Sequence, residues 1–429
     1  MNSDLRVPEQ GVLTLIILMM AAYLFVDFSY GAFVLAGFGE LKVSLVFKAL
    51  LLSLVVMYLA VAKPRYALIC IGLVACFLVP ILFALLRGAD VSGFVYDLTF
   101  ATKFLAPILV FLFWCSIADK PDRLNSSRLV LWVLTGAVVF NSILGALGIG
   151  FHSYGSPEVG FGNPGLIFAA NEYGALLIVI VGFVLNESWL RGAITFGSVA
   201  IISVLVTLMV ATKTALLGVV LLVALVPLFN ERTLLFRPTV MKLKVLTLVL
   251  VSCSVIALLL SQFFQDLGLF NRALFFYEAG GLSRLIFSGR DEMAGAMVTA
   301  YIDASDLLHW IFGAPPSFFV SQGVKPSAEI DPFDLLMWFG PLSFFTLCVW
   351  IVIVFGFSWR ALVSASCREA PAVISVNIAL LAAASIAGHV WTSGVVGVAW
   401  ATLNATVVWP SGEHSGKSTD RRGLTKASA

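Results

Sequence analysis

The sequence has 429 residues, of which 60% are hydrophobic and only 12% are charged. This composition excludes a soluble globular protein and indicates a polytopic membrane protein. The net charge of +2, without any run of Lys and Arg interleaved with aromatic residues, predicts no nucleic-acid partner. The six cysteines follow neither a disulfide framework nor a metal-ligand spacing, so we expect no metal site and no cofactor.

Apolar segments of membrane-spanning length follow one another along the whole chain. They predict an all-α fold with about twelve transmembrane helices, the first of which we expect to stay uncleaved. No internal repeat or glycine-rich nucleotide loop is evident. The predicted spans are 11–28, 41–62, 66–87, 94–116, 127–149, 164–185, 193–210, 213–229, 243–263, 333–357, 371–390 and 393–408.

The distribution of basic residues predicts the orientation of these spans. If the N-terminus is cytoplasmic, 17 of the 26 Lys and Arg residues fall in cytoplasmic segments. Both termini would then be cytoplasmic, with one large extracytoplasmic loop. The predicted organisation is transmembrane helices in 1–263, the loop in 264–332, further helices in 333–408 and a disordered cytoplasmic tail in 409–429.

Six ionisable residues are predicted within spans, toward their outer ends. Such a group is costly in a membrane unless it faces a partner or a hydrated cavity. Because the six come from several helices, they predict together a cavity open to the outside. For single residues an internal salt bridge, such as Asp97 with Lys103, is the alternative. The six residues are Lys48, Asp97, Lys103, Glu172, Lys213 and His389.

The long loop contains a predicted amphipathic helix at the bilayer surface. Ser288 is expected to be its N-cap and Asp291 a capping-box acid. Arg290 then lies in the first turn, where a cation is unfavourable unless an anion such as phosphate is bound. Charge balance by Asp291 and Glu292 is the alternative. The apolar face comprises Met293, Ala296, Met297, Ala300 and Tyr301.

Three carboxylates precede or open the span at 333–357. Pro332 suits a first helical turn, so Asp331 is the expected N-cap and Asp334 its N3 residue. Glu329 lies before this cap and has no structural role that the sequence explains.

Several short motifs occur in order through the second half of the chain. They are Gly162-Asn163-Pro164-Gly165, Ala170-Asn171-Glu172, Ala211-Thr212-Lys213-Thr214, Phe287-Ser288-Gly289-Arg290, His309-Trp310-Ile311-Phe312-Gly313, Glu329-Ile330-Asp331 with Gly340, and Ala387-Gly388-His389. Together they resemble the O-antigen polymerase and ligase family of bacterial polysaccharide assembly. Where ligases have a histidine before the span at 333–357, this chain has Glu329 and Asp331, which favours the polymerase branch.

The resemblance implies a GT-C-like, metal-independent glycosyltransferase of the bacterial inner membrane, with its active site on the periplasmic side. Its product would be O-antigen, capsule or exopolysaccharide. Donor and acceptor would both be oligosaccharides linked to undecaprenyl pyrophosphate in the lipid bilayer. Chain-length regulators and flippases are the protein partners that such a reaction implies.

This chemistry needs cations for the pyrophosphate and a base for the acceptor hydroxyl. Glu329 or Asp331 is the candidate base. Arg290, Arg284 and Lys213 are the candidate pyrophosphate ligands, with Lys48 and Lys103 lining the same cavity. Further candidate residues for binding the substrate are Asn171, Glu172 and His389.

Three other functions fit part of the sequence. An O-antigen ligase would transfer the glycan to lipid A core instead. An ion-coupled transporter would also bury ionisable residues, but is expected to have internal repeats and discontinuous helices. A non-catalytic membrane subunit would use the large loop to bind a partner.

The predicted topology is tested by cysteine labelling in a variant whose six native cysteines are replaced. A single cysteine at Gln322 should react with an impermeant thiol reagent in intact spheroplasts, because 264–332 is predicted outside. A cysteine at Ser418 should react only after lysis. The opposite pattern would invert the topology and contradict an extracytoplasmic site.

Overall fold

A computed structural model describes residues 6–408, apart from 39–41, 89, 121, 155–161, most of 232–287, and 305. The predicted span 243–263, the beginning of the loop 264–332 and the tail 409–429 lie wholly or largely outside the described residues. The described elements are α-helices: α1 (Arg6–Leu35), α2 (Val43–Ala62), α3 (Pro64–Leu86), α4 (Val91–Ser116), α5 (Arg123–Ala146), α6 (Ala170–Trp189), α7 (Ala193–Val210), α8 (Lys213–Asn230), α11 (Arg290–Ala304), α12 (Leu307–Phe312), α13 (Pro316–Ser321), α14 (Asp331–Ser364), α15 (Ala370–Ile386) and α16 (Gly397–Ala405).

Nine of the described helices, α1 to α8 and α14, are long and apolar enough to cross a membrane. Within a bilayer a helix satisfies its own backbone hydrogen bonds, which explains why these apolar runs are helical. The predicted all-α, multi-pass membrane architecture is therefore confirmed. The last two predicted spans differ from expectation, because α15 has 17 residues and α16 only nine.

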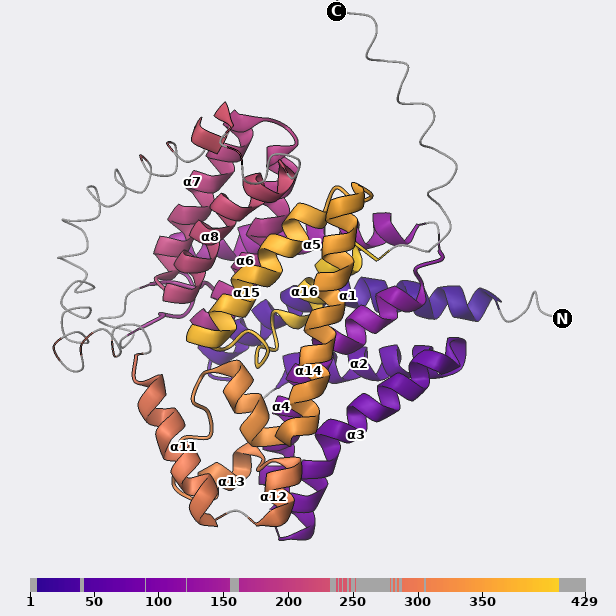
Figure 1. Cartoon of the computed structure of the whole chain (residues 1–429), viewed down its shortest axis with the longest axis vertical. Coiled ribbons are helices and arrows are strands. Elements are labelled where there is room, and N and C mark those ends of the chain that lie inside the picture. Colours follow the sequence, from indigo (N-terminus) through magenta and orange to yellow (C-terminus); the bar gives the residue numbers. More distant parts are fainter. Residues whose placement is uncertain are drawn as a thin grey trace, which may run out of the picture.

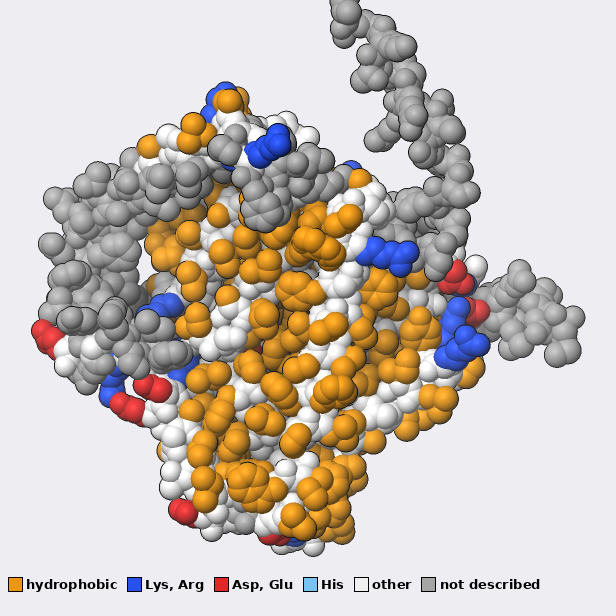
Figure 2. Space-filling model, viewed as in Figure 1, with side chains coloured by type: hydrophobic (Ala, Val, Ile, Leu, Met, Phe, Trp, Pro, Cys, Tyr) orange, Lys and Arg blue, Asp and Glu red, His pale blue; other side chains and the backbone are white. Residues whose placement is uncertain are grey.

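Polar contacts gather at two opposite ends of the helix bundle. At one end Arg128 lies 3.0 Å from Glu187 and 3.3 Å from Glu369, which joins α5, α6 and the turn before α15. At the other end α11, α12 and α13 lie together beside the start of α14 (Figure 1). Hydrophobic side chains cover the middle of the visible face, and charged ones lie mainly near its edges (Figure 2).

Helix α14 is broken at Gly340, where φ is 74° and ψ is 179°. A Cβ at this position would lie 2.6 Å from the carbonyl carbon of Phe312, so the turn after α12 packs directly on the break. The Ala314 amide donates to Met337 O at 2.8 Å. The break therefore seats the α12–α13 pair against the first turns of α14.

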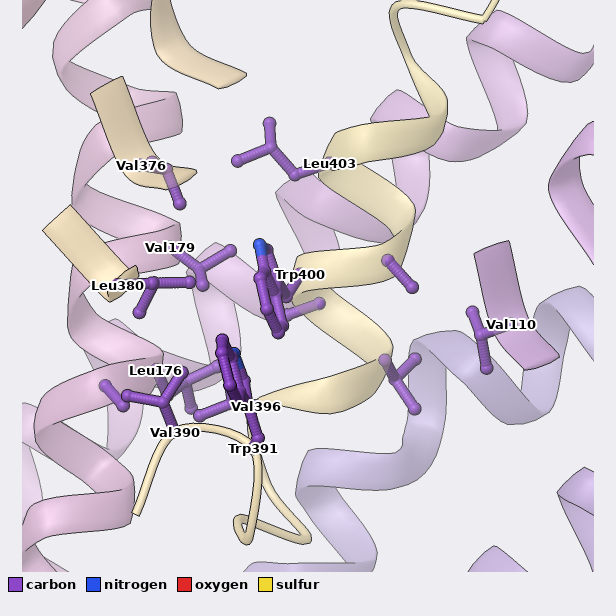
Figure 3. Close-up of a cluster of buried hydrophobic side chains, with 14 of the residues drawn as sticks. Val110, Leu176, Val179, Val376, Leu380, Val390, Trp391, Val396, Trp400 and Leu403 are labelled. Carbon is purple, nitrogen blue, oxygen red and sulfur yellow. The ribbon is translucent and has the colours of Figure 1, made fainter. Parts of the chain in front are cut away.

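The segment between α15 and α16, residues 387–396, is not helical although it lies inside the bundle. Figure 3 shows Val390, Trp391 and Val396 of this segment packed with side chains of α6 and α15. All its residues are buried except His389 and Gly394, which are partly exposed. The predicted span 393–408 is thus corrected to a buried non-helical entry followed by a nine-residue helix.

Replacing Gly340 by Ala tests the importance of this break. The backbone conformation at Gly340 is one that essentially only glycine adopts, so Gly340→Ala should lower the free energy of unfolding by at least about 1–3 kcal/mol. Gly356→Ala on the same helix is the matched control, because a Cβ there meets nothing within 4 Å. Thermal unfolding in detergent measures both. Equal stability of the two variants would contradict a fixed break.

Candidate functional site

Three cationic groups converge on the carboxylate of Glu329. Arg290 Nη2 lies 3.0 Å from Oε2, and Lys325 Nζ lies 2.7 Å from Oε1. The Nε2 atom of His389 is 3.5 Å from Oε2. The groups come from α11, from the segment before α14 and from the segment after α15. We call these four residues the Glu329 cluster.

The backbone around Glu329 is held in an unusual conformation. Its φ is +59°, in the left-handed region that is rare for residues other than glycine. Gly388 packs against it so closely that a Cβ would lie 2.3 Å from Glu329 O. The amide of Glu329 donates to Ser327 Oγ at 3.0 Å. Such strain is typical of functional sites, where the surrounding structure maintains it.

Asp334 supports the same segment. Its predicted role as the N3 partner of a capping residue is not observed. Its carboxylate accepts from Ser327 Oγ and from the Ala328 amide, both at 2.7 Å. Asp334 is fully buried. It therefore shapes the turn that leads to Glu329.

Asp331 also differs from its predicted role, because the N-cap of α14 is Ile330 and no side chain caps this helix. The carboxylate of Asp331 instead reaches the segment after α15. One oxygen accepts from the His389 amide at 2.9 Å and from Thr392 Oγ1 at 3.1 Å. The other accepts from the amides of Val390 and Trp391 at 2.7 and 2.8 Å. Asp331 is a positioning residue for His389 and leaves Glu329 as the candidate base.

The cluster shifts the ionisation of its members. The contact with His389 and the cation Lys325 hold the pKa of the Glu329 carboxyl well below its usual range, although burial opposes this. Near neutral pH Glu329 is therefore a carboxylate, and a protonated His389 would be stabilised beside it.

Lys213 lies next to the residues that precede Arg290. Its Nζ donates to Ser288 Oγ at 3.0 Å. Lys213 opens α8, and Thr212 caps this helix by accepting from the Ala215 amide. Ser288 has a φ of +57° and lies two residues before α11, which begins at Arg290, so its predicted N-cap role is not observed.

Arg284 pairs with an acid other than Glu329. It forms an ion pair with Glu292 in the first turn of α11, where both side chains are substantially exposed. No described contact joins Arg284 to Glu329. Arg290, in contrast, is buried and pairs with Glu329.

Lys48 and Lys103 line a cavity of about 920 Å³ between α1, α2, α4, α6 and residues 394–398. Lys48 Nζ lies 2.7 Å from Asp27, and Lys103 Nζ lies 3.3 Å from Glu172. Of the six ionisable residues predicted to face one cavity, three therefore line this one: Lys48, Lys103 and Glu172. We call this space the α2/α4 cavity.

The segment after α15 connects the cavity with the Glu329 cluster. Ser393 Oγ donates to Glu172 Oε2 at 2.9 Å, only four residues beyond His389. Gly394 lies against both lysines, since a Cβ there would be 3.6 Å from Lys48 Nζ and from Lys103 Cε. The segment from His389 to Gly394 thus connects the Glu329 cluster with the cavity lining.

Two other predicted residues lie apart from these contacts. Asp97 accepts from the amide of Ser317 at 2.8 Å, at the start of α13, so the predicted pair with Lys103 is not formed. Asn171 is the second residue of α6 and is partly exposed beside Glu172.

The sequence analysis missed Lys325, Asp27 and Ser393. Lys325 precedes Glu329 by four residues, but a non-helical segment gives no periodic signal for such a pair. Asp27 lies inside the predicted span 11–28, so the rule that intramembrane charges need a partner could have found it. In the described residues, His, Cys, Asp and Glu side chains form no group of three that could hold a metal ion.

Comparisons with known proteins yielded no match to any family model, curated protein or solved structure. The chemistry of the site therefore has to be argued from its own geometry.

The different roles of the two buried aspartates give a testable contrast. Asp331→Asn would set an amide N–H₂ against backbone donors, so it should cost about 2–5 kcal/mol of stability. Asp334→Asn should cost only about 1 kcal/mol, because its amide can donate to the Ser327 hydroxyl and still accept from Ala328. Thermal unfolding of both variants is the measurement. A larger loss for Asp334→Asn would contradict these assignments.

Proposed function

We propose that the protein is a polysaccharide polymerase, a glycosyltransferase that moves a growing glycan from undecaprenyl pyrophosphate onto a second lipid-linked repeat unit. The observation that supports this most is the Glu329 cluster. Three cationic groups surround one carboxylate at one end of a membrane helix bundle, next to a large cavity. Cations and a base in contact are what transfer from a pyrophosphate donor requires.

The reaction assigns a role to each group. An acceptor hydroxyl attacks the anomeric carbon of the donor sugar while the bond from that carbon to the pyrophosphate oxygen breaks. The proton of the hydroxyl passes to the Glu329 carboxylate. Arg290, Lys325 and protonated His389 stabilise the negative charge that develops on the pyrophosphate. Lys213 is a further candidate, because it contacts Ser288, which lies two residues before Arg290.

The carboxylate of Glu329 contacts the same groups that the pyrophosphate would need. A bound pyrophosphate would compete for Arg290, Lys325 and His389 and would release the carboxylate. Freed from these cations, the pKa of Glu329 would rise toward values at which a carboxylate accepts a proton more readily. Donor binding and activation of the base are then one event.

One observation favours the alternative of an ion-coupled transporter. Helix α14 is broken at Gly340, and residues 387–396 are non-helical inside the bundle. Transporters bind ions and substrates at such discontinuities. This alternative predicts substrate movement driven by an ion gradient and no change in glycan length.

The proposed function is tested with purified protein in proteoliposomes that contain undecaprenyl-pyrophosphate-linked repeat units from the producing cells. Mass spectrometry should detect lipid-linked glycans of two and more repeat units, without nucleotide sugar. Transfer only after addition of lipid A core would identify a ligase instead. Gradient-driven uptake without glycan elongation would identify a transporter, and absence of all three activities would contradict an enzymatic or transport role.

The role of Glu329 is tested by Glu329→Gln. This change keeps the side-chain shape but removes the proton acceptor, so the single-turnover elongation rate should fall on the order of 10²-fold or more. Donor binding should persist or tighten, because a competing carboxylate charge is lost. Glu292→Gln is the matched control, since Glu292 pairs with the exposed Arg284 on the same loop. Normal elongation by Glu329→Gln would exclude Glu329 as the base.

The release of Glu329 by the donor is tested by pH profiles. The acidic limb of kcat/KM reports the free enzyme, in which the pKa of Glu329 is lowered, whereas that of kcat reports the substrate complex. As pH falls, kcat should therefore decline at a higher pH than kcat/KM does. Coincident acidic limbs would contradict displacement of the cations from Glu329.

A further inference from the structure

The α2/α4 cavity has a different charge arrangement from the Glu329 cluster. Lys48 contacts both carboxylate oxygens of Asp27, at 2.7 and 2.8 Å, and Lys103 is paired with Glu172. Asp27 and Glu172 are 7% and 13% exposed, so both pairs are largely desolvated. Lys48 and Lys103 thus each have a counter-charge within the protein, whereas Lys42, the third lysine of the cavity lining, is exposed.

Paired charges of this kind disfavour an anionic ligand. A phosphate at Lys48 or Lys103 would have to displace a buried carboxylate, which would then lack its partner. A hydroxyl group needs no such exchange, because it both donates and accepts hydrogen bonds. It can donate to Asp27 or Glu172 while accepting from Lys48 or Lys103.

The rest of the cavity wall is suited to the body of an amphiphile. Tyr30, Tyr96 and Phe100 add aromatic surface near the paired charges, and Leu51, Leu52 and Val95 add apolar surface. Val95 and Tyr96 are 46% and 39% exposed, so this wall continues to the outside of the helix bundle. A mostly apolar cavity with a few convergent polar groups is typical of small-molecule sites.

From this arrangement we infer that the α2/α4 cavity binds a lipid with an uncharged, hydroxyl-rich head group, that is, a sugar-headed amphiphile. The assignment of this ligand as the glycan end of the acceptor rests on the proposed function. The short segment from His389 to the cavity-lining Gly394 would then connect the acceptor sugar site with Glu329. The pyrophosphate would be held at the Glu329 cluster and the sugar in the cavity.

The binding class is tested with the full-length protein in lipid nanodiscs and two probes of equal tail length, radiolabelled hexyl glucoside and hexyl phosphate. Empty nanodiscs give the background. Because the Glu329 cluster can itself hold a phosphate, binding in the cavity is measured as the part that Val95→Trp removes, and this part should be at least about tenfold tighter for the glucoside than for the phosphate. Glu172→Gln leaves Lys103 without its counter-charge and should shift the preference toward the phosphate. Asp119→Asn is the matched control, because Asp119 pairs with Lys63 outside the cavity.

A second variant tests the location without changing charge. Val95→Trp should fill the cavity and weaken glucoside binding at least about tenfold. Val61→Trp, at an 82% exposed position of α2, is the control and should bind like the wild-type protein. The inference is overturned if the binding that Val95→Trp removes prefers hexyl phosphate, or if Val95→Trp leaves glucoside binding unchanged.

Elongation assays separate this inference from the proposed function. If the wild-type protein binds the glucoside as described but elongates no glycan, the proposed function fails and the sugar site is supported. If the wild-type protein elongates glycans and Val95→Trp binds the glucoside normally, the sugar site is overturned while the proposed function is supported.

Discussion

The arrangement of both sites depends on the buried carboxylate of Asp331. A non-helical segment inside a membrane bundle leaves backbone N–H groups without their usual helical partners, so other acceptors have to replace them. Asp331 accepts from three successive amides and a hydroxyl of residues 389–392. These contacts tie the start of α14 to the segment after α15. Glu329 and His389 meet because each lies two residues or fewer from this junction.

Much of the helical architecture follows from composition alone. Long apolar runs bounded by charged turns leave few alternatives to membrane helices, and α1 to α8 and α14 correspond to nine predicted spans. Arg290 was predicted to be a site residue because a cation in a first helical turn is unfavourable unless an anion is bound. Glu329 was predicted to be the candidate base because the sequence gives it no role in capping the helix. Both residues violate a local rule, and such violations are expected at functional sites.

Other features could not be predicted because local patterns do not reveal distant partners. The pattern Asp331-Pro332-Phe333-Asp334 is that of a capped helix start, yet the partners of Asp331 lie about 60 residues further along the chain. An apolar run likewise does not distinguish a membrane helix from a buried non-helical segment, which explains why 393–408 was assigned as a full span. Pairing of Lys48 and Lys103 with acids on other helices is a third tertiary effect of this kind.

The two sites differ in how they balance charge, and this difference has a chemical consequence. At the Glu329 cluster, three potential cations face one carboxylate, so the site gains favourable interactions by accepting an anion. In the α2/α4 cavity, Lys48 and Lys103 each face a carboxylate, so an anion at either lysine would break a buried pair. The segment from His389 to Gly394 links these two environments. A substrate with a charged leaving group and a neutral glycan would therefore be oriented by electrostatics before any sugar-specific contact forms.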